Sequence, residues 1–112
     1  MSNGGAGATR RPRRVVILGA ARQGTATARF FLAAGDYVTL SDTRPAGQLA
    51  DVASALVAFA AGLGAAERLR FAFGGHPLSL LEGADLLCLS GGVSPAIPLV
   101  RAAIAAGIPL RP

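Results

Sequence analysis

The chain has 112 residues, which is enough for one domain with a hydrophobic core but short for a complete two-substrate enzyme. Its formal net charge of +5 comes from eleven arginines against six acidic residues. Because it has no lysine, a lysine-dependent phosphate site and a Schiff base are excluded within it. Glycine, proline and arginine interrupt every apolar run before the roughly 20 residues that a membrane helix needs. The sequence therefore predicts a soluble cytoplasmic domain with no membrane partner.

Residues 1–13 predict a flexible basic leader that precedes an ordered domain over residues 14–112. The leader starts with small, mostly polar residues and has no apolar segment behind them, so it is not a secretory signal. Its end and the first domain residue carry four arginines, Arg10, Arg11, Arg13 and Arg14. Because no aromatic residues or reading helix accompany them, a solvated tail is favoured over an arm that binds nucleic acid, and no nucleic-acid partner is expected.

The segment Gly19-Ala20-Ala21-Arg22-Gln23-Gly24 predicts a turn that holds a phosphate. It lies between a predicted strand over residues 14–19 and a predicted helix that ends at Gly35-Asp36. A tight glycine turn that opens a helix directs free backbone N–H groups and the positive end of the helix dipole at an anion. Ala21 stands where the dinucleotide fingerprint usually has its middle glycine, so the spacing alone leaves a purely structural turn open.

Asp42 strengthens the prediction of a nucleotide site. It follows a second predicted strand over residues 37–41, where a carboxylate can accept hydrogen bonds from a nucleoside. An amphipathic helix is predicted over residues 48–63 and a third strand over residues 69–73. The apolar stripe of that helix consists of Leu49, Val52, Ala53, Leu56, Phe59, Ala60 and Leu63.

Beyond the third strand, Gly74-Gly75-His76-Pro77 leads into a short predicted helix over residues 78–82. His76 is the lone histidine, and both a local hydrogen bond and a contact with a ligand stay open for it. A fourth strand is predicted over residues 85–89, in which Cys88 is a buried apolar residue and not a nucleophile or metal ligand.

The loop Ser90-Gly91-Gly92-Val93-Ser94-Pro95 follows the fourth strand. Its glycines allow a ligand to approach the backbone closely, although a flexible connector is the alternative. A last helix is predicted from about Ile97 to Gly107, with a fifth strand from about residue 108. The residues predicted to be buried by that helix are Val100, Ala103 and Ile104.

The alternation of strands and helices predicts an α/β fold with a doubly wound parallel five-stranded sheet, Rossmann-like, in strand order 3-2-1-4-5. In this order the sheet reverses between the first and fourth strands, so the turn at Gly19–Gly24 faces the loop at Ser90–Pro95. Asp42 ends the neighbouring strand on the same rim. The three segments therefore converge where open α/β sheets bind their ligands.

The sequence from about residue 14 to residue 112 resembles the N-terminal domain of the MurD family. These ligases add D-glutamate to UDP-N-acetylmuramoyl-L-alanine (UDP-MurNAc-L-Ala) in peptidoglycan synthesis. Ala21 and Gly91 depart from the family, which usually has glycine and proline there. The motifs that carry the resemblance are Val15-Val16-Ile17-Leu18-Gly19, Arg22-Gln23-Gly24, Ser41-Asp42-Thr43-Arg44-Pro45, Gly74-Gly75-His76, Gly83-Ala84-Asp85-Leu86, Ser90-Gly91-Gly92-Val93, Ile97-Pro98 and Ala105-Ala106-Gly107-Ile108-Pro109.

The resemblance implies that this chain binds the UDP moiety of UDP-MurNAc-L-Ala. The diphosphate is expected at the backbone N–H groups of Arg22 and Gln23. The residues implied to surround the uracil are Asp42, Thr43, Ser90, Gly91 and Gly92, with Arg44 at the border of the pocket.

In the family, ATP, Mg²⁺ and D-glutamate belong to a central and a C-terminal domain. We therefore expect this chain to be part of a larger ligase, to be inactive alone, and to contain no catalytic residue, cofactor site or metal site. The alternative is an NAD(P)-binding module of a dehydrogenase or redox-sensing regulator, in which Asp42 accepts from ribose hydroxyls.

Overall fold

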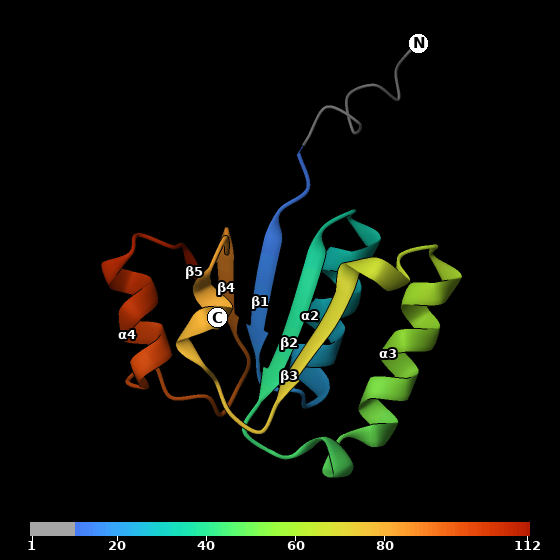
Figure 1. Ribbon diagram of the computed structural model, residues 1–112, viewed down its shortest axis with the longest axis horizontal. Coiled ribbons are helices and arrows are strands. Elements are labelled where there is room, and N and C mark those ends of the chain that lie inside the picture. Colours follow the sequence, from blue (N-terminus) through green and yellow to red (C-terminus); the bar gives the residue numbers. More distant parts are fainter. Residues whose placement is uncertain (1–10) are drawn as a thin grey trace.

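The computed structural model describes residues 11–112, in which five strands alternate with helices (Figure 1). The strands are β1 (Arg14–Leu18), β2 (Tyr37–Asp42), β3 (Leu69–Phe73), β4 (Leu86–Leu89) and β5 (Leu110–Arg111). The α-helices are α2 (Arg22–Ala33), α3 (Ala50–Gly62) and α4 (Pro98–Ala105), and the short 3₁₀ helices are η1 (Ala46–Gln48), η2 (Ala66–Arg68) and η3 (Leu78–Leu81). Over this part of the chain, no helix is long and apolar enough to cross a membrane.

All five strands pair in parallel in one sheet with the order β3-β2-β1-β4-β5, which confirms the predicted doubly wound fold. The central strand β1 pairs with β2 on one side and β4 on the other. Its residues Val15–Leu18 are all buried. A central strand of a parallel sheet is covered on both faces, so it is read in the sequence as a continuous apolar run.

Two apolar clusters cover the two faces of the sheet. Val15 and Ile17 of β1 belong to the cluster that includes α2 and α3, whereas Val16 and Leu18 belong to the cluster that includes α4. Figure 1 shows α2 and α3 together on one side of the strands and α4 on the other. The residues predicted for the buried face of α2 are confirmed as Gly24, Ala28, Phe31 and Leu32.

Two apolar residues assigned to buried stripes are exposed instead. Leu63 lies just beyond the end of α3 and is 45% exposed. Ile104 in α4 is 60% exposed, while Leu99, which the prediction omitted, is buried. The buried face of α4 is centred near Ala103, and the next residue in an α-helix is turned by about 100° from it. The prediction for Ile104 was therefore wrong because the stripe was placed one position too far along the helix.

Arg13, which the sequence places in the leader, is attached to the domain. Its backbone N–H donates to Asp36 Oδ1 at 2.9 Å, and its guanidinium Nη2 donates to Oδ2 at 3.3 Å. The guanidinium also lies 5.3 Å from the centre of the Phe31 ring. Arg13 is thus paired with a buried carboxylate, in contrast to the expected solvated arm. Arg10 and the rest of residues 1–10 lie outside the described part, so the leader itself stays a prediction.

Candidate functional site

The predicted site lies at the carboxyl edge of the sheet, where the segments that follow β1, β2, β3 and β4 meet (Figure 1). Gly19 follows β1 with φ of +101°, a left-handed conformation that favours glycine. A Cβ on Gly19 would collide with Ser90 Oγ, and a Cβ on Gly24 would collide with the carbonyl oxygen of Gly19. These two glycines therefore let the turn after β1 pack tightly against both α2 and the loop after β4.

The first turn of α2 presents backbone donors to this edge. Its N-cap residue Ala21 makes no side-chain hydrogen bond, and the turn contains no acidic residue. No acceptor within the described chain pairs with the backbone N–H of Arg22 or Gln23. Ala21 has an extended backbone (φ −80°, ψ −172°), which alanine adopts without strain. The missing fingerprint glycine therefore does not remove the donors that a phosphate needs.

The carboxylate of Asp42 is buried and accepts four hydrogen bonds. Its Oδ2 accepts from the Ala20 N–H at 2.8 Å and from Arg44 Nη2 at 2.9 Å. Its Oδ1 accepts from the Arg44 backbone N–H at 2.9 Å and from Arg44 Nε at 3.0 Å. The side-chain bonds from Arg44, with the backbone N–H groups, hold the pKa of Asp42 well below its usual range despite burial. The lowered pKa keeps Asp42 ionised at neutral pH. Its four hydrogen bonds use about all of the lone-pair positions that a carboxylate offers, so it is saturated with donors from the protein.

Ser90 and Gln23 join the loop after β4 to the turn after β1. The buried Ser90 Oγ lies 2.6 Å from the carbonyl oxygen of Leu18 and 3.1 Å from that of Gly19. Gln23 Oε1 accepts from the Gly91 N–H at 2.7 Å. The loop is therefore tied to the turn and is not a free connector. The side chains of Ser90 and Gln23 are therefore used in hydrogen bonds within the protein.

An open pocket of about 220 Å³ lies between these segments. Of the residues predicted for the site, Asp42, Thr43 and Gly92 line it, whereas five others do not, namely Arg22, Gln23, Arg44, Ser90 and Gly91. Pockets for whole small molecules span about 300–1,000 Å³, so this one suits one ring of a larger ligand. Its complete lining is Gly19, Asp42, Thr43, His76, Gly92, Val93, Ser94 and Ile97.

His76 is the lining residue whose role the sequence left open. Its Nδ1 lies 2.7 Å from Ser41 Oγ. Burial lowers the pKa of the imidazole, and the nearby charge of Asp42 raises it by less, so the ring is neutral at neutral pH. One feature of the sequence indicates this placement: the loop that carries His76 follows β3, and β3 pairs with β2, which ends at Asp42. Val93 and Ile97 form an apolar part of the lining, and although both fall within motifs of the resemblance, neither was predicted as a site residue.

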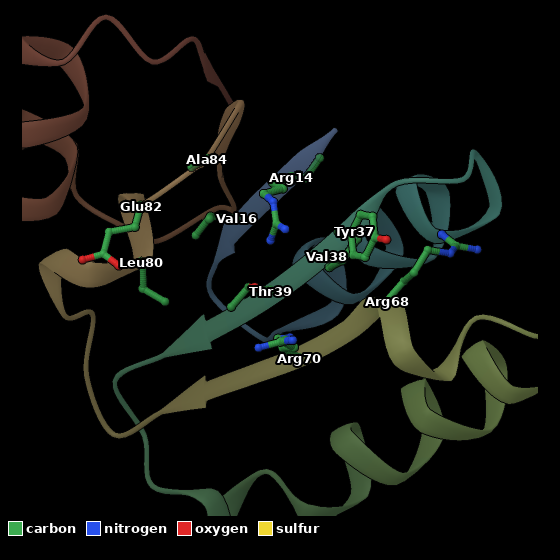
Figure 2. A pocket seen from close by; sticks show the side chains of 11 residues that line it. Arg14, Val16, Tyr37, Val38, Thr39, Arg68, Arg70, Leu80, Glu82 and Ala84 are labelled. Carbon is green, nitrogen blue, oxygen red and sulfur yellow. The ribbon is translucent and has the colours of Figure 1, made fainter. Parts of the chain in front are cut away.

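A second hollow lies on the sheet face, near the starts of the strands (Figure 2). Strand residues such as Tyr37 and Arg70 line one side of it, and Leu80 and Glu82 line the other. Its volume of about 50 Å³ is too small for a nucleotide, and none of the predicted site residues belongs to it. Throughout residues 11–112, no three His, Cys, Asp or Glu side chains are grouped to hold a metal ion.

Curated proteins with similar sequences share one name. The chain is 43% identical over 97 residues to UDP-N-acetylmuramoylalanine--D-glutamate ligase of Syntrophotalea carbinolica, a match that covers 87% of this chain and 20% of that protein. The ligase of the same name from Desulfosudis oleivorans is 38% identical over 98 residues, covering 88% of this chain and 20% of that protein. The chain thus spans about a fifth of the length of these relatives.

Solved structures share the fold. A pseudomurein peptide ligase type C from Methanothermus fervidus has a TM-score of 0.63 and 22% identity, over 89% of this chain and 19% of that chain. An (S)-3-hydroxybutyryl-CoA dehydrogenase from Ralstonia eutropha has a TM-score of 0.56 and 20% identity, over 89% of this chain and 38% of that chain. At such identities the similarity speaks for the fold alone. The family described as "Mur ligase MurD-like, N-terminal domain" matches residues 13–111, so the chain belongs to the MurD-like N-terminal domains of the Mur ligases.

Proposed function

We propose that this chain is the substrate-binding domain of a UDP-N-acetylmuramoylalanine--D-glutamate ligase and binds the UDP moiety of UDP-MurNAc-L-Ala. The observation that carries the proposal is the pocket beside Asp42 and Thr43, which lies on the same rim as the unpaired N–H groups of α2. A pocket of about 220 Å³ suits a planar base, and a helix N-terminus suits a diphosphate. The names of the relatives supply the choice of substrate.

In this proposal the diphosphate binds the backbone N–H groups of Arg22 and Gln23. The positive end of the α2 dipole adds to their attraction, since no acidic residue in the first turn opposes it. Gln23 also holds the opposite loop through Gly91, so the diphosphate binds where the two segments are already joined.

The uracil occupies the pocket, against Asp42, Thr43 and Gly92. Because the Asp42 carboxylate is saturated, we assign it the support of the pocket through Ala20 and Arg44. Ser90 supports the loop that carries Gly92. In this proposal only some of the predicted site residues contact the base.

The ligation step is assigned to the rest of a longer protein. In the full-length ligase we propose ATP, Mg²⁺ and D-glutamate as the further partners. We assign ATP and Mg²⁺ to the other domains of that ligase, since this chain has no lysine to bind the phosphates of ATP. Binding the UDP moiety is therefore the proposed task of this domain.

Calorimetry with UDP-MurNAc-L-Ala, UDP and NAD tests the proposal, and the uridine compounds should bind more tightly than NAD. Asp42→Ala should weaken binding of UDP-MurNAc-L-Ala roughly ten- to hundredfold, because the turn loses its anchor at Ala20. The control is Asp51→Ala, an exposed change on α3 that should leave affinity unaltered.

The NAD-binding alternative makes the opposite prediction. Tighter binding of NAD than of UDP, or normal substrate binding by a folded Asp42→Ala protein, would contradict the proposal. The similarity to a dehydrogenase lends no weight to NAD, since at 20% identity it concerns the fold alone.

A further inference from the structure

The loop that carries His76 is held rigidly beside the pocket. The backbone N–H groups of Gly74 and Gly75 both donate to the carbonyl oxygen of Asp42, at 2.9 and 3.1 Å. Gly74 also donates to the carbonyl oxygen of Arg44 at 2.9 Å, and its φ of +96° favours glycine. The loop after β3 is therefore attached to the end of β2, and the imidazole that follows has a defined position in the pocket wall.

Ser41 selects one tautomer of the His76 ring. Its buried Oγ lies 3.0 Å from the carbonyl oxygen of Gly75 and 2.7 Å from His76 Nδ1. The hydroxyl has a single proton, and the carbonyl can only accept. Both contacts are hydrogen bonds only if Ser41 donates to Gly75 and His76 Nδ1–H donates to Ser41. The proton of the neutral ring then sits on Nδ1, and Nε2 carries a free lone pair.

The free lone pair matters because the carboxylate in the pocket lining is already occupied. Asp42 already accepts four hydrogen bonds, whereas Nε2 of His76 has no hydrogen-bond partner within residues 11–112. We propose that His76 Nε2 is the acceptor that recognises a ring N–H of the bound base, and that Ser41 is the residue that positions it. For the proposed uridine ligand, on which this inference rests, the donor is the imide N3–H of uracil.

This assignment makes the pocket selective for bases with a ring N–H. A base or analogue without that proton leaves Nε2 unpaired, and a methyl group in its place also meets the imidazole. The protonated ring would present N–H at Nε2 and repel the donor. The negative charge of Asp42 favours the protonated imidazole, and Asp42 stays ionised over the pH range in which His76 titrates. The neighbouring cation Arg44 is paired with Asp42.

The test compares a UDP-sugar such as UDP-N-acetylglucosamine with its N3-methyl analogue, both of which carry a diphosphate that does not titrate near neutral pH. The wild-type chain should prefer the unmethylated ligand by about tenfold, the loss expected for one hydrogen bond. His76→Ala should reduce the preference to less than about twofold, because it removes the acceptor and opens space for the methyl group. His76→Gln, which retains an acceptor oxygen, should keep part of it, and the exposed control Ser79→Ala should keep all of it.

A second measurement uses only the wild-type chain, so it does not depend on how well a variant folds. As the pH falls from about 7.5 to about 5, affinity for the UDP-sugar should drop while affinity for the N3-methyl analogue should stay level. A folded His76→Ala protein that keeps the full preference, a wild type without one, or parallel pH profiles would overturn the inference. If the wild type binds no uridine ligand at all, the proposed function fails instead.

Discussion

At the scale of single residues, the pairing of Asp42 makes stability depend on pH. We expect Asp42→Asn to lower the free energy of unfolding by about 1–3 kcal/mol near neutral pH, because the donors of Ala20 and Arg44 lose a charged acceptor. The pKa of Asp42 is lower in the folded than in the unfolded chain. The stabilisation is therefore present above the unfolded value, near 3.8, and is lost as the pH falls through the lower folded value.

Urea titrations from about pH 7 down to about pH 3 check this expectation. The difference between wild type and Asp42→Asn should be constant down to about pH 4 and then narrow. A matched control is Glu82→Gln, which changes an exposed carboxylate outside the network and should alter stability little at any pH. A difference that does not narrow in acid would contradict the role assigned to the carboxylate.

Gly24 is the second residue with a sharp requirement, since its Cα packs against the carbonyl oxygen of Gly19. Gly24→Ala should destabilise the fold by about 1–3 kcal/mol or more, because the added methyl group forces α2 away from β1. Gly62→Ala is the matched change at the end of α3, where no atom beyond the adjacent residues and the backbone of the same helix lies within 4 Å of the new Cβ. It should be neutral or slightly stabilising. Equal melting temperatures for the two variants would show that the close approach is unimportant.

At the scale of elements, the buried face of α4 decides which of its apolar residues stabilise the fold. Leu99 is 1% exposed and belongs to the cluster on the α4 face of the sheet, whereas Ile104 is 60% exposed. Leu99→Ala should cost about 2–5 kcal/mol, while Ile104→Ala should cost less than about 1 kcal/mol. Denaturant unfolding of both variants measures the difference in the free energy of unfolding. A larger decrease for Ile104→Ala than for Leu99→Ala would instead support the prediction from the sequence that Ile104 is buried.

At the scale of the whole molecule, the chain should bind without performing catalysis. Incubated with ATP, Mg²⁺, D-glutamate and UDP-MurNAc-L-Ala, the 112-residue protein should release no phosphate above background. The reason is chemical: it has no lysine, and residues 11–112 contain no cluster of metal ligands. Phosphate release that depends on the substrate, from protein free of a contaminating ligase, would refute the assignment of the chemistry to other domains.

Much of the architecture could be predicted because its signals are local. The apolar run Val15–Leu18 marks the central strand, and the 3.6-residue period marks α2 and its buried face. The rule that parallel crossovers are right-handed then leaves few ways to arrange five strands, and the predicted order is the one observed. The ends of the elements differ by one or two residues, since strand 85–89 becomes Leu86–Leu89 and helix 48–63 becomes Ala50–Gly62.

The sequence by itself determined which segments gather at the carboxyl edge of the sheet, because strand order follows from periodicity and chain connection. Only the tertiary structure decided what each side chain does there. Asp42 gives its acceptors to Ala20 and Arg44, and Gln23 gives its oxygen to Gly91, 68 positions away. His76 enters the pocket wall because Ser41, 35 positions earlier, holds its ring. Hydrogen bonds between distant residues depend on distances of a few tenths of an ångström, which no pattern along one chain specifies.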